Sequence, residues 1–229
     1  MLIDRFLGFL SALTPQLTLI GLIAISALML VVEDRRLSLI PLLGQYILVA
    51  LLISSQIYRP IVFIRMGLGA AICLMLYITA GHVQHELTIL RPLLHTEPQN
   101  WPTSLTAAFR VMSLAGLGPL FRLCVMALGG LIAYGIWRTY PMPMVSTELS
   151  LTSYWLIATG LLMALISGDP LRIGFGLLTF VNGFEGIYLV LEQSLMVISL
   201  LGISDMIMAL ATAVCTEAWL ESFKGEAAA

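Results

Sequence analysis

Three carboxylic acids lie in or beside long apolar segments near the C-terminus. Glu185 is in the middle of LLTFVNGFEGIYLVLEQS (residues 177–194), and Glu192 is near its end. Asp205 is near the centre of the next segment, LMVISLLGISDMIMALATAVCTEAW. An ionised side chain that faces hydrocarbon costs about 2.5 to 3.5 kcal/mol even on the lenient insertion scale, so these acids must face protein or a hydrated cavity. A carboxyl group out of bulk water binds a proton more readily than a solvated one, and proton transfer is the chemistry that suits it.

The segment around Glu185 is two-sided if it is helical, with successive side chains about 100° apart. Small residues gather on one face, where they let another membrane helix approach closely. They are Gly176, Thr179, Gly183 and Gly186. Glu185, Tyr188 and Glu192 gather on roughly the opposite face. In the next segment Asp205 shares a polar stripe with Ser194, Thr212 and Thr216.

Only the three residues EQS separate these two segments, so their helices must be antiparallel neighbours. At about 1.5 Å per residue, Glu185 lies roughly 10 Å and Asp205 roughly 16 Å below the turn, a difference that one water could bridge. We therefore expect a hydrated seam shared by the two acids, with at least one of them protonated near neutral pH. Packing through interhelical hydrogen bonds is the alternative role for both.

The composition predicts an all-α, polytopic membrane protein. Of 229 residues, 59% are hydrophobic and only 10% are charged, whereas soluble domains carry about a quarter charged residues. A span needs on the order of 20 apolar residues, which predicts about seven spans, with six to eight as the range. They lie near residues 15–32, 37–57, 61–81, 120–137, 149–167, 172–191 and 195–216.

A long polar connection divides the chain. It predicts an N-terminal three-helix block (1–81), a polar or amphipathic connection (82–119) and a C-terminal membrane block (120–229), with 105–121 as a candidate amphipathic or re-entrant helix. The first span lacks the pattern of a cleaved secretory signal. Positive residues favour the cytoplasmic side, so the C-terminus is expected there and the N-terminus outside. The basic residues predicted on the cytoplasmic side are Arg35, Arg36, Arg91, Arg110, Arg122, Arg172 and Lys224. Those predicted on the outer side are Arg5, Arg59, Arg65 and Arg138.

Other polar residues are expected to be structural. His82 and His85 flank the end of the third span beside Glu86 and fit an interfacial position better than a metal or haem site, because no second ligand pair is visible. Arg65 is expected to snorkel to the interface, and Arg122 likewise. We expect the three cysteines to be small buried side chains of the core; they are Cys73, Cys124 and Cys215. The sequence has no cofactor-binding motif and no cluster of basic residues that would bind nucleic acid. We therefore expect neither a cofactor nor a nucleic-acid partner.

The stretches DPLRIGFGLLTFVNGFEGIYLVLEQS and LGISDMIMALATAV resemble the C-terminal part of component E of hydrogenase-4 and related group 4 membrane hydrogenases. That family is similar to the small K subunit of respiratory complex I. Arg172, Asn182, Gly183 and Asp205 match the family pattern of an arginine at the helix start, a Glu-Asn-Gly-like step and a mid-membrane acid. The family glutamate is replaced by Val181, and Glu185 follows one helical turn later on the same face.

The resemblance implies a subunit of the membrane arm in a bacterial or archaeal cytoplasmic membrane. Its partners there would be antiporter-like subunits and hydrogenase- or quinone-linked subunits, and buried acids would carry protons. Because the sequence has no nucleotide-binding loop, nucleophile motif or redox cysteine pair, we expect no bond-making reaction from this chain alone. Because of Val181, a structural or assembly subunit without proton transfer is the first alternative. A small independent transporter is the second, although the two blocks show no convincing repeat.

Overall fold

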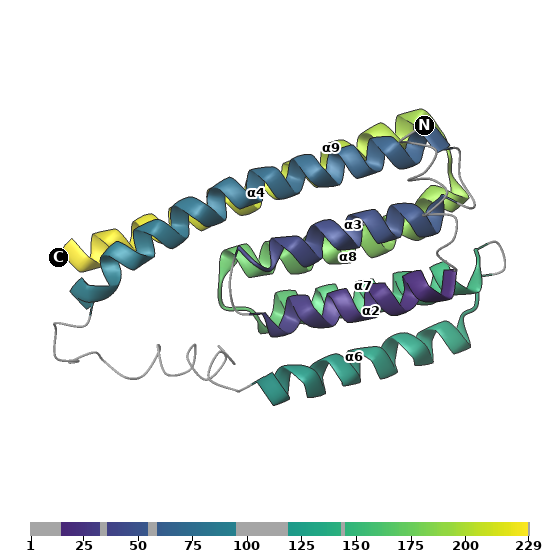
Figure 1. The fold of residues 1–229 in the computed structure, drawn as a ribbon, viewed down its shortest axis with the longest axis horizontal. Helices are drawn as coiled ribbons and strands as arrows, with labels where there is room; N and C mark the ends of the chain where they lie inside the picture. The colour runs from purple at the N-terminus through teal and green to yellow at the C-terminus, as the bar shows by residue number, and fades with distance from the viewer. Residues whose placement is uncertain (1–14, 33–35, 55–58, 95–118, 143–144, 229) are drawn as a thin grey trace.

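The computed structural model describes residues 15–32, 36–54, 59–94, 119–142 and 145–228, and all regular secondary structure in these residues is helical. Each predicted span overlaps one helix, and α4 and α9 extend beyond the predicted ends at residues 81 and 216 (Figure 1). The helices are α2 (Pro15–Val31), α3 (Leu39–Ile53), α4 (Arg59–Leu94), α6 (Pro119–Thr139), α7 (Thr147–Ile166), α8 (Pro170–Leu191) and α9 (Leu195–Ala228). The all-α class predicted from the sequence is confirmed for these parts of the chain.

Five helices are long and apolar enough to cross a membrane, and they are α4, α6, α7, α8 and α9. The apolar helices α2 and α3 are shorter, with 17 and 15 residues. Large apolar side chains cover much of the outer surface, among them Leu131, Leu165 and Met196, which are 70%, 71% and 84% exposed. Such a surface suits lipid, and the chain is accordingly described as an integral membrane protein. The count of seven spans stays a prediction.

The helices form two layers. Helices α2, α3 and α4 lie side by side in one layer, and α7, α8 and α9 lie behind them in the other, so that α2 packs on α7, α3 on α8 and α4 on α9 (Figure 1). Helix α6 flanks the bundle and packs against α7 and α2. The predicted N-terminal and C-terminal blocks are therefore packed face to face within one bundle.

The closest packing joins α7 and α8, and glycines make it possible. A Cβ atom added at Gly176 would lie 2.6 Å from the backbone nitrogen of Ala164, and one at Gly183 would lie 2.7 Å from Cβ of Leu156. Helix α8 begins with Pro170 in its first turn, and the Asp169 side chain accepts a hydrogen bond from the backbone N–H of Leu171 at 3.3 Å. This capping fixes the start of the helix that carries Glu185.

Helices α4 and α9 run in the same direction and project beyond the rest of the bundle at their C-terminal ends (Figure 1). They have 36 and 34 residues, which correspond to about 54 and 51 Å at about 1.5 Å per residue. Arg36 donates a hydrogen bond to the carbonyl oxygen of Gly81 at 3.1 Å, at the level of the predicted span end. The expected boundary at residue 81 thus lies inside α4. Most of the candidate helix 105–121 lies outside the described residues.

Candidate functional site

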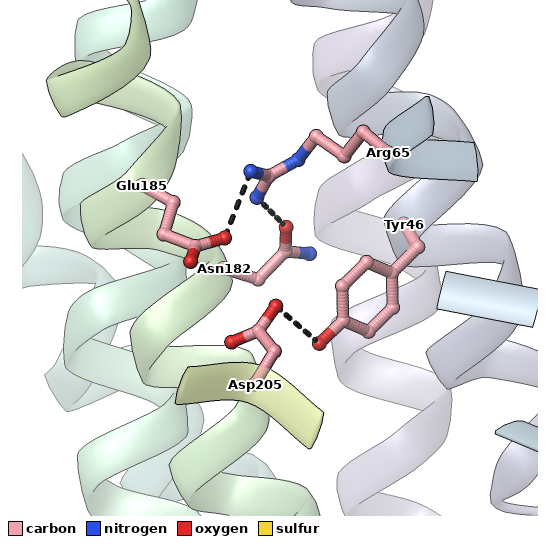
Figure 2. A network of polar contacts seen from close by, with 5 residues as sticks. All are labelled: Tyr46, Arg65, Asn182, Glu185 and Asp205. Carbon is pink, nitrogen blue, oxygen red and sulfur yellow. Dashed lines mark hydrogen bonds and ion pairs between the residues drawn. The ribbon is translucent and has the colours of Figure 1, made fainter. Parts of the chain in front are cut away.

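A buried ion pair joins α4 to α8. Arg65 Nη1 lies 2.8 Å from Glu185 Oε2, and the two side chains are 7% and 1% exposed. Arg65 Nη2 also donates a hydrogen bond of 2.7 Å to Oδ1 of Asn182, one turn earlier on α8 (Figure 2). The expectation that Arg65 snorkels to the interface is wrong. The guanidinium group instead contacts a carboxylate and an amide oxygen inside the protein. Its N–H donors lie in one plane, which suits planar acceptors of this kind.

Asp205 reaches the same cluster from α9 and is fully buried. Tyr46, on α3, points its hydroxyl group at the aspartate and donates a long hydrogen bond of 3.4 Å to Asp205 Oδ2 (Figure 2). Gly69 makes room for this tyrosine, because a Cβ atom there would lie 2.7 Å from Cγ of Tyr46. The Asp205 carboxyl also interacts with the Glu185 carboxyl and, over a longer range, with the Arg65 charge. Four helices therefore supply one polar cluster, which we call the Arg65 cluster: Tyr46, Arg65, Asn182, Glu185 and Asp205.

The buried face of α9 places Asp205 in the cluster. Asp205, Ala209, Thr212 and Thr216 are spaced along one face, and all four are buried. The two threonines donate hydrogen bonds to carbonyl oxygens of their own helix, at 2.8 and 2.7 Å. Asp205 is thus the member of the predicted polar stripe whose side chain bonds to another helix.

The Arg65 cluster has unused hydrogen-bonding atoms. In the described part of the chain, four atoms of the cluster are buried without a hydrogen-bond partner, namely Glu185 Oε1, Asp205 Oδ1, Arg65 Nε and Asn182 Nδ2. Two of these atoms are carboxylate oxygens, which only accept hydrogen bonds when ionised. The two carboxyl groups can therefore bond directly only if one of them carries a proton. The arrangement can therefore hold one proton between the two acids.

The other predicted site residues occupy different positions. Glu192 is exposed and follows the last residue of α8, and it is not one of the five residues of the Arg65 cluster (Figure 2). Arg172 donates a hydrogen bond of 2.8 Å to the carbonyl oxygen of Val32, and so ties the start of α8 to the end of α2. Neither residue contributes to the Arg65 cluster.

The small-residue face of α8 divides into two contacts. Gly176, Gly183 and Gly186 face α7, where a Cβ atom at Gly186 would lie 3.0 Å from Ser153 Oγ. Thr179 instead points to α3, and its hydroxyl donates a hydrogen bond of 3.1 Å to Oε1 of Gln45. Gln45 is fully buried, and nothing in the sequence analysis singled it out.

The histidines lie outside any cluster of metal ligands. His82 and His85 are both exposed on α4, and within the described ranges no three His, Cys, Asp or Glu residues come together to hold a metal ion. Cys73 is buried, but Cys124 and Cys215 are exposed, contrary to the expectation that all three are core residues. The reason is that α6 and α9 lie at the edges of the bundle, so one face of each is uncovered.

Tyr46 and Arg65 were missed as site residues, although one signal was available. Arg65 lies inside the predicted third span, and a cation there needs a carboxylate or a backbone carbonyl as a partner. Comparison of the chain with protein-family models, curated proteins and solved structures gave no match in any of the three. The resemblance to the hydrogenase-4 and complex I subunits therefore stays a prediction based on the matched residues.

Proposed function

We propose that this chain is a membrane subunit of a complex I-like or group 4 hydrogenase-like energy-converting complex, and that the Arg65 cluster passes protons. The observation that carries the proposal is a pair of interacting acids, Glu185 and Asp205, buried beside a single arginine. Ionisable side chains inside membrane helices are expensive to place, so they are expected to have a function. The motif residues Asn182 and Asp205 both belong to this cluster, which is consistent with the resemblance.

Charge balance assigns a role to each member. Arg65 compensates the charge of Glu185, to which it is paired at 2.8 Å. A second ionised acid would leave one buried negative charge uncompensated, and such a charge costs several kcal/mol. Asp205 therefore holds a proton at rest. It releases this proton when a neighbouring group of higher proton affinity comes within reach, either in a partner subunit or after a conformational change. Tyr46 orients the Asp205 carboxyl through its hydroxyl group.

Glu185 takes the place of the family glutamate that is absent at Val181. In the structure Val181 is half-buried, whereas Glu185 is 1% exposed and paired with Arg65. The shift of one helical turn thus leaves a carboxylate in the protein interior beside the motif residue Asn182. The partner subunits that the resemblance implies, antiporter-like and hydrogenase- or quinone-linked ones, would supply the groups before and after this cluster in the path.

A purely structural role is the second candidate, and one observation favours it. The Arg65–Glu185 ion pair and the Arg65–Asn182 hydrogen bond connect α4 to α8, so they fix two helices of different layers. A structural subunit needs this connection but has no need for a proton on Asp205. The two candidates therefore differ in what they predict for Asp205.

The deciding experiment measures proton pumping by the Asp205→Asn variant in the complex purified in mild detergent and reconstituted in vesicles, with NADH or hydrogen as reductant. A relay predicts that Asp205→Asn keeps assembly and electron transfer but loses proton pumping, because asparagine cannot ionise. The matched control is Glu192→Gln, the same change at an exposed acid of α8, which should pump normally. Undiminished pumping by Asp205→Asn would end the relay proposal in favour of a structural role.

A further inference from the structure

Gly69 of α4 packs directly against the tyrosine of the Arg65 cluster. A Cβ atom added at Gly69 would lie 2.7 Å from both Cβ and Cγ of Tyr46 and 3.0 Å from its Cδ1. Ordinary van der Waals contacts of a Cβ atom are 3.4 Å or longer. Helices α3 and α4 can therefore approach this closely only because residue 69 has no side chain.

The close approach at Gly69 places the Tyr46 hydroxyl group on Asp205. The hydroxyl donates the 3.4 Å hydrogen bond to Asp205 Oδ2 (Figure 2), whereas Asp205 Oδ1 has no hydrogen-bond partner in the described part of the chain. A hydrogen bond to an ionised acceptor is roughly twice as strong as one between neutral groups. The Tyr46 bond therefore stabilises the ionised form of Asp205 more than the protonated form, and it favours release of the proton.

Polar contacts with α8 hold both α3 and α4 in place near this point. Helix α4 is joined to α8 by the ion pair of Arg65, which lies one turn before Gly69. Helix α3 is joined to α8 by Gln45, whose Oε1 accepts a hydrogen bond of 3.1 Å from Thr179. Gln45 directly precedes Tyr46 and is fully buried. A side chain at position 69 would therefore push apart two helices that are both anchored to a third.

The hydrogen bond from Tyr46 to Asp205 tolerates the least displacement of these contacts. Asp205 belongs to α9, which packs on α4, so a movement of α3 away from α4 also moves Tyr46 away from Asp205. A hydrogen bond is lost beyond about 3.5 Å, and this one is already 3.4 Å long. Moving an added Cβ atom from 2.7 Å to the ordinary 3.4 Å requires several times more displacement than the bond tolerates.

We infer that Gly69 is a positioning residue for proton release at Asp205, because its lack of a side chain lets the Tyr46 hydroxyl reach the aspartate and stabilise it once the proton has left. The inference rests on the proposed function, since it concerns the same proton. It deepens that function by naming the residue that sets how readily Asp205 gives up its proton. Gly69 acts through Tyr46 and takes no part in the transfer itself.

The test compares Gly69→Ala with Gly67→Ala in the purified complex, reconstituted in vesicles as for Asp205→Asn. Each variant adds one methyl group to α4, but a Cβ atom at Gly67 has nothing within 4 Å. Gly69→Ala should keep electron transfer and lower the number of protons pumped per electron by about fivefold, the typical difference between hydrogen bonds to ionised and to neutral acceptors. Gly67→Ala should pump like the wild type.

A second substitution distinguishes positioning from packing alone. Tyr46→Phe removes the hydroxyl group but keeps every atom that a methyl group at position 69 would contact. Tyr46→Phe alone should therefore lower pumping as much as Gly69→Ala does. In the Tyr46→Phe background, Gly69→Ala should lower the midpoint of thermal unfolding as it does in the wild type, but should cause no further loss of pumping. Additive losses of pumping would show that Gly69→Ala acts only through packing and would overturn the inference.

The outcomes separate this inference from the proposed function. If Asp205→Asn loses pumping but Gly69→Ala or Tyr46→Phe pumps fully, the relay stands and the positioning role of Gly69 is refuted. If Asp205→Asn itself pumps normally, the relay and the positioning role both fail. The result for Tyr46→Phe does not depend on whether Gly69→Ala assembles, because removing one hydroxyl group leaves the contact between α3 and α4 unchanged.

Discussion

Replacing Arg65 with glutamine should strongly destabilise the protein. The change removes the partner of Glu185 at 2.8 Å and the donor to Asn182 at 2.7 Å. Removing one member of a buried ion pair typically costs about 3 to 5 kcal/mol, because the remaining charge stays buried and uncompensated. In a chain of this size each kcal/mol lowers the midpoint of thermal unfolding by about 2 to 4 °C, so the expected loss is about 6 to 20 °C.

The assay follows helix content by circular dichroism while the protein is heated in mild detergent. Glu185→Gln should also be destabilising, because it leaves the arginine buried without its carboxylate. The double variant, with glutamine at both positions, should melt closer to the wild type than either single variant does, since it contains neither buried charge of the pair. This recovery measures the coupling between the two side chains.

The control is Arg138→Gln, the same change at an exposed arginine in the last turn of α6. Exposed substitutions usually change stability by less than about 0.5 kcal/mol, so this variant should melt within about 2 °C of the wild type. If Arg65→Gln melted in the same narrow range, the buried ion pair would contribute no net stability. A double variant no more stable than the single ones would refute the direct coupling.

Two further predictions concern packing and orientation. Gly183→Leu should separate α7 from α8 and so prevent assembly of the proposed complex, seen as loss of any co-purifying subunits. Gly135→Leu should behave like the wild type, because nothing lies within 4 Å of the added Cβ atom. Normal assembly of both variants would show that close approach at Gly183 is unimportant. In a cysteine-free background, Ser222→Cys near the C-terminus should react with a membrane-impermeant thiol reagent only after the cells are opened, and Thr139→Cys should react in intact cells, because basic residues favour the cytoplasmic side. The reverse labelling pattern would contradict the predicted orientation.

The sequence alone determined the helical class and the approximate place of each described helix along the chain, although it placed the C-terminal ends of α4 and α9 too early. Apolar runs of about 20 residues have few alternatives to a helix in a membrane, because each backbone N–H and C=O group must be paired within the segment. The same local rules indicated that α8 has a small-residue face and an acidic face. They also showed that α8 and α9 are neighbours, since three residues cannot connect helices that lie apart. All of this information is short-range along the chain.

Only the tertiary structure decided which side chains meet. Arg65 and Glu185 are 120 residues apart, and Tyr46 and Asp205 are 159 residues apart, so no spacing in the sequence indicates either contact. The structure also distinguished Glu185 from Glu192, which share a face of the same helix but differ because α8 ends before the second. Periodicity gives the direction of a side chain around its own helix, whereas its partner depends on how the helices of the two layers pack against one another. That packing brings α3, α4, α8 and α9 around one point, where the single positive charge of Arg65 is paired with Glu185 and lies near a second acid, Asp205.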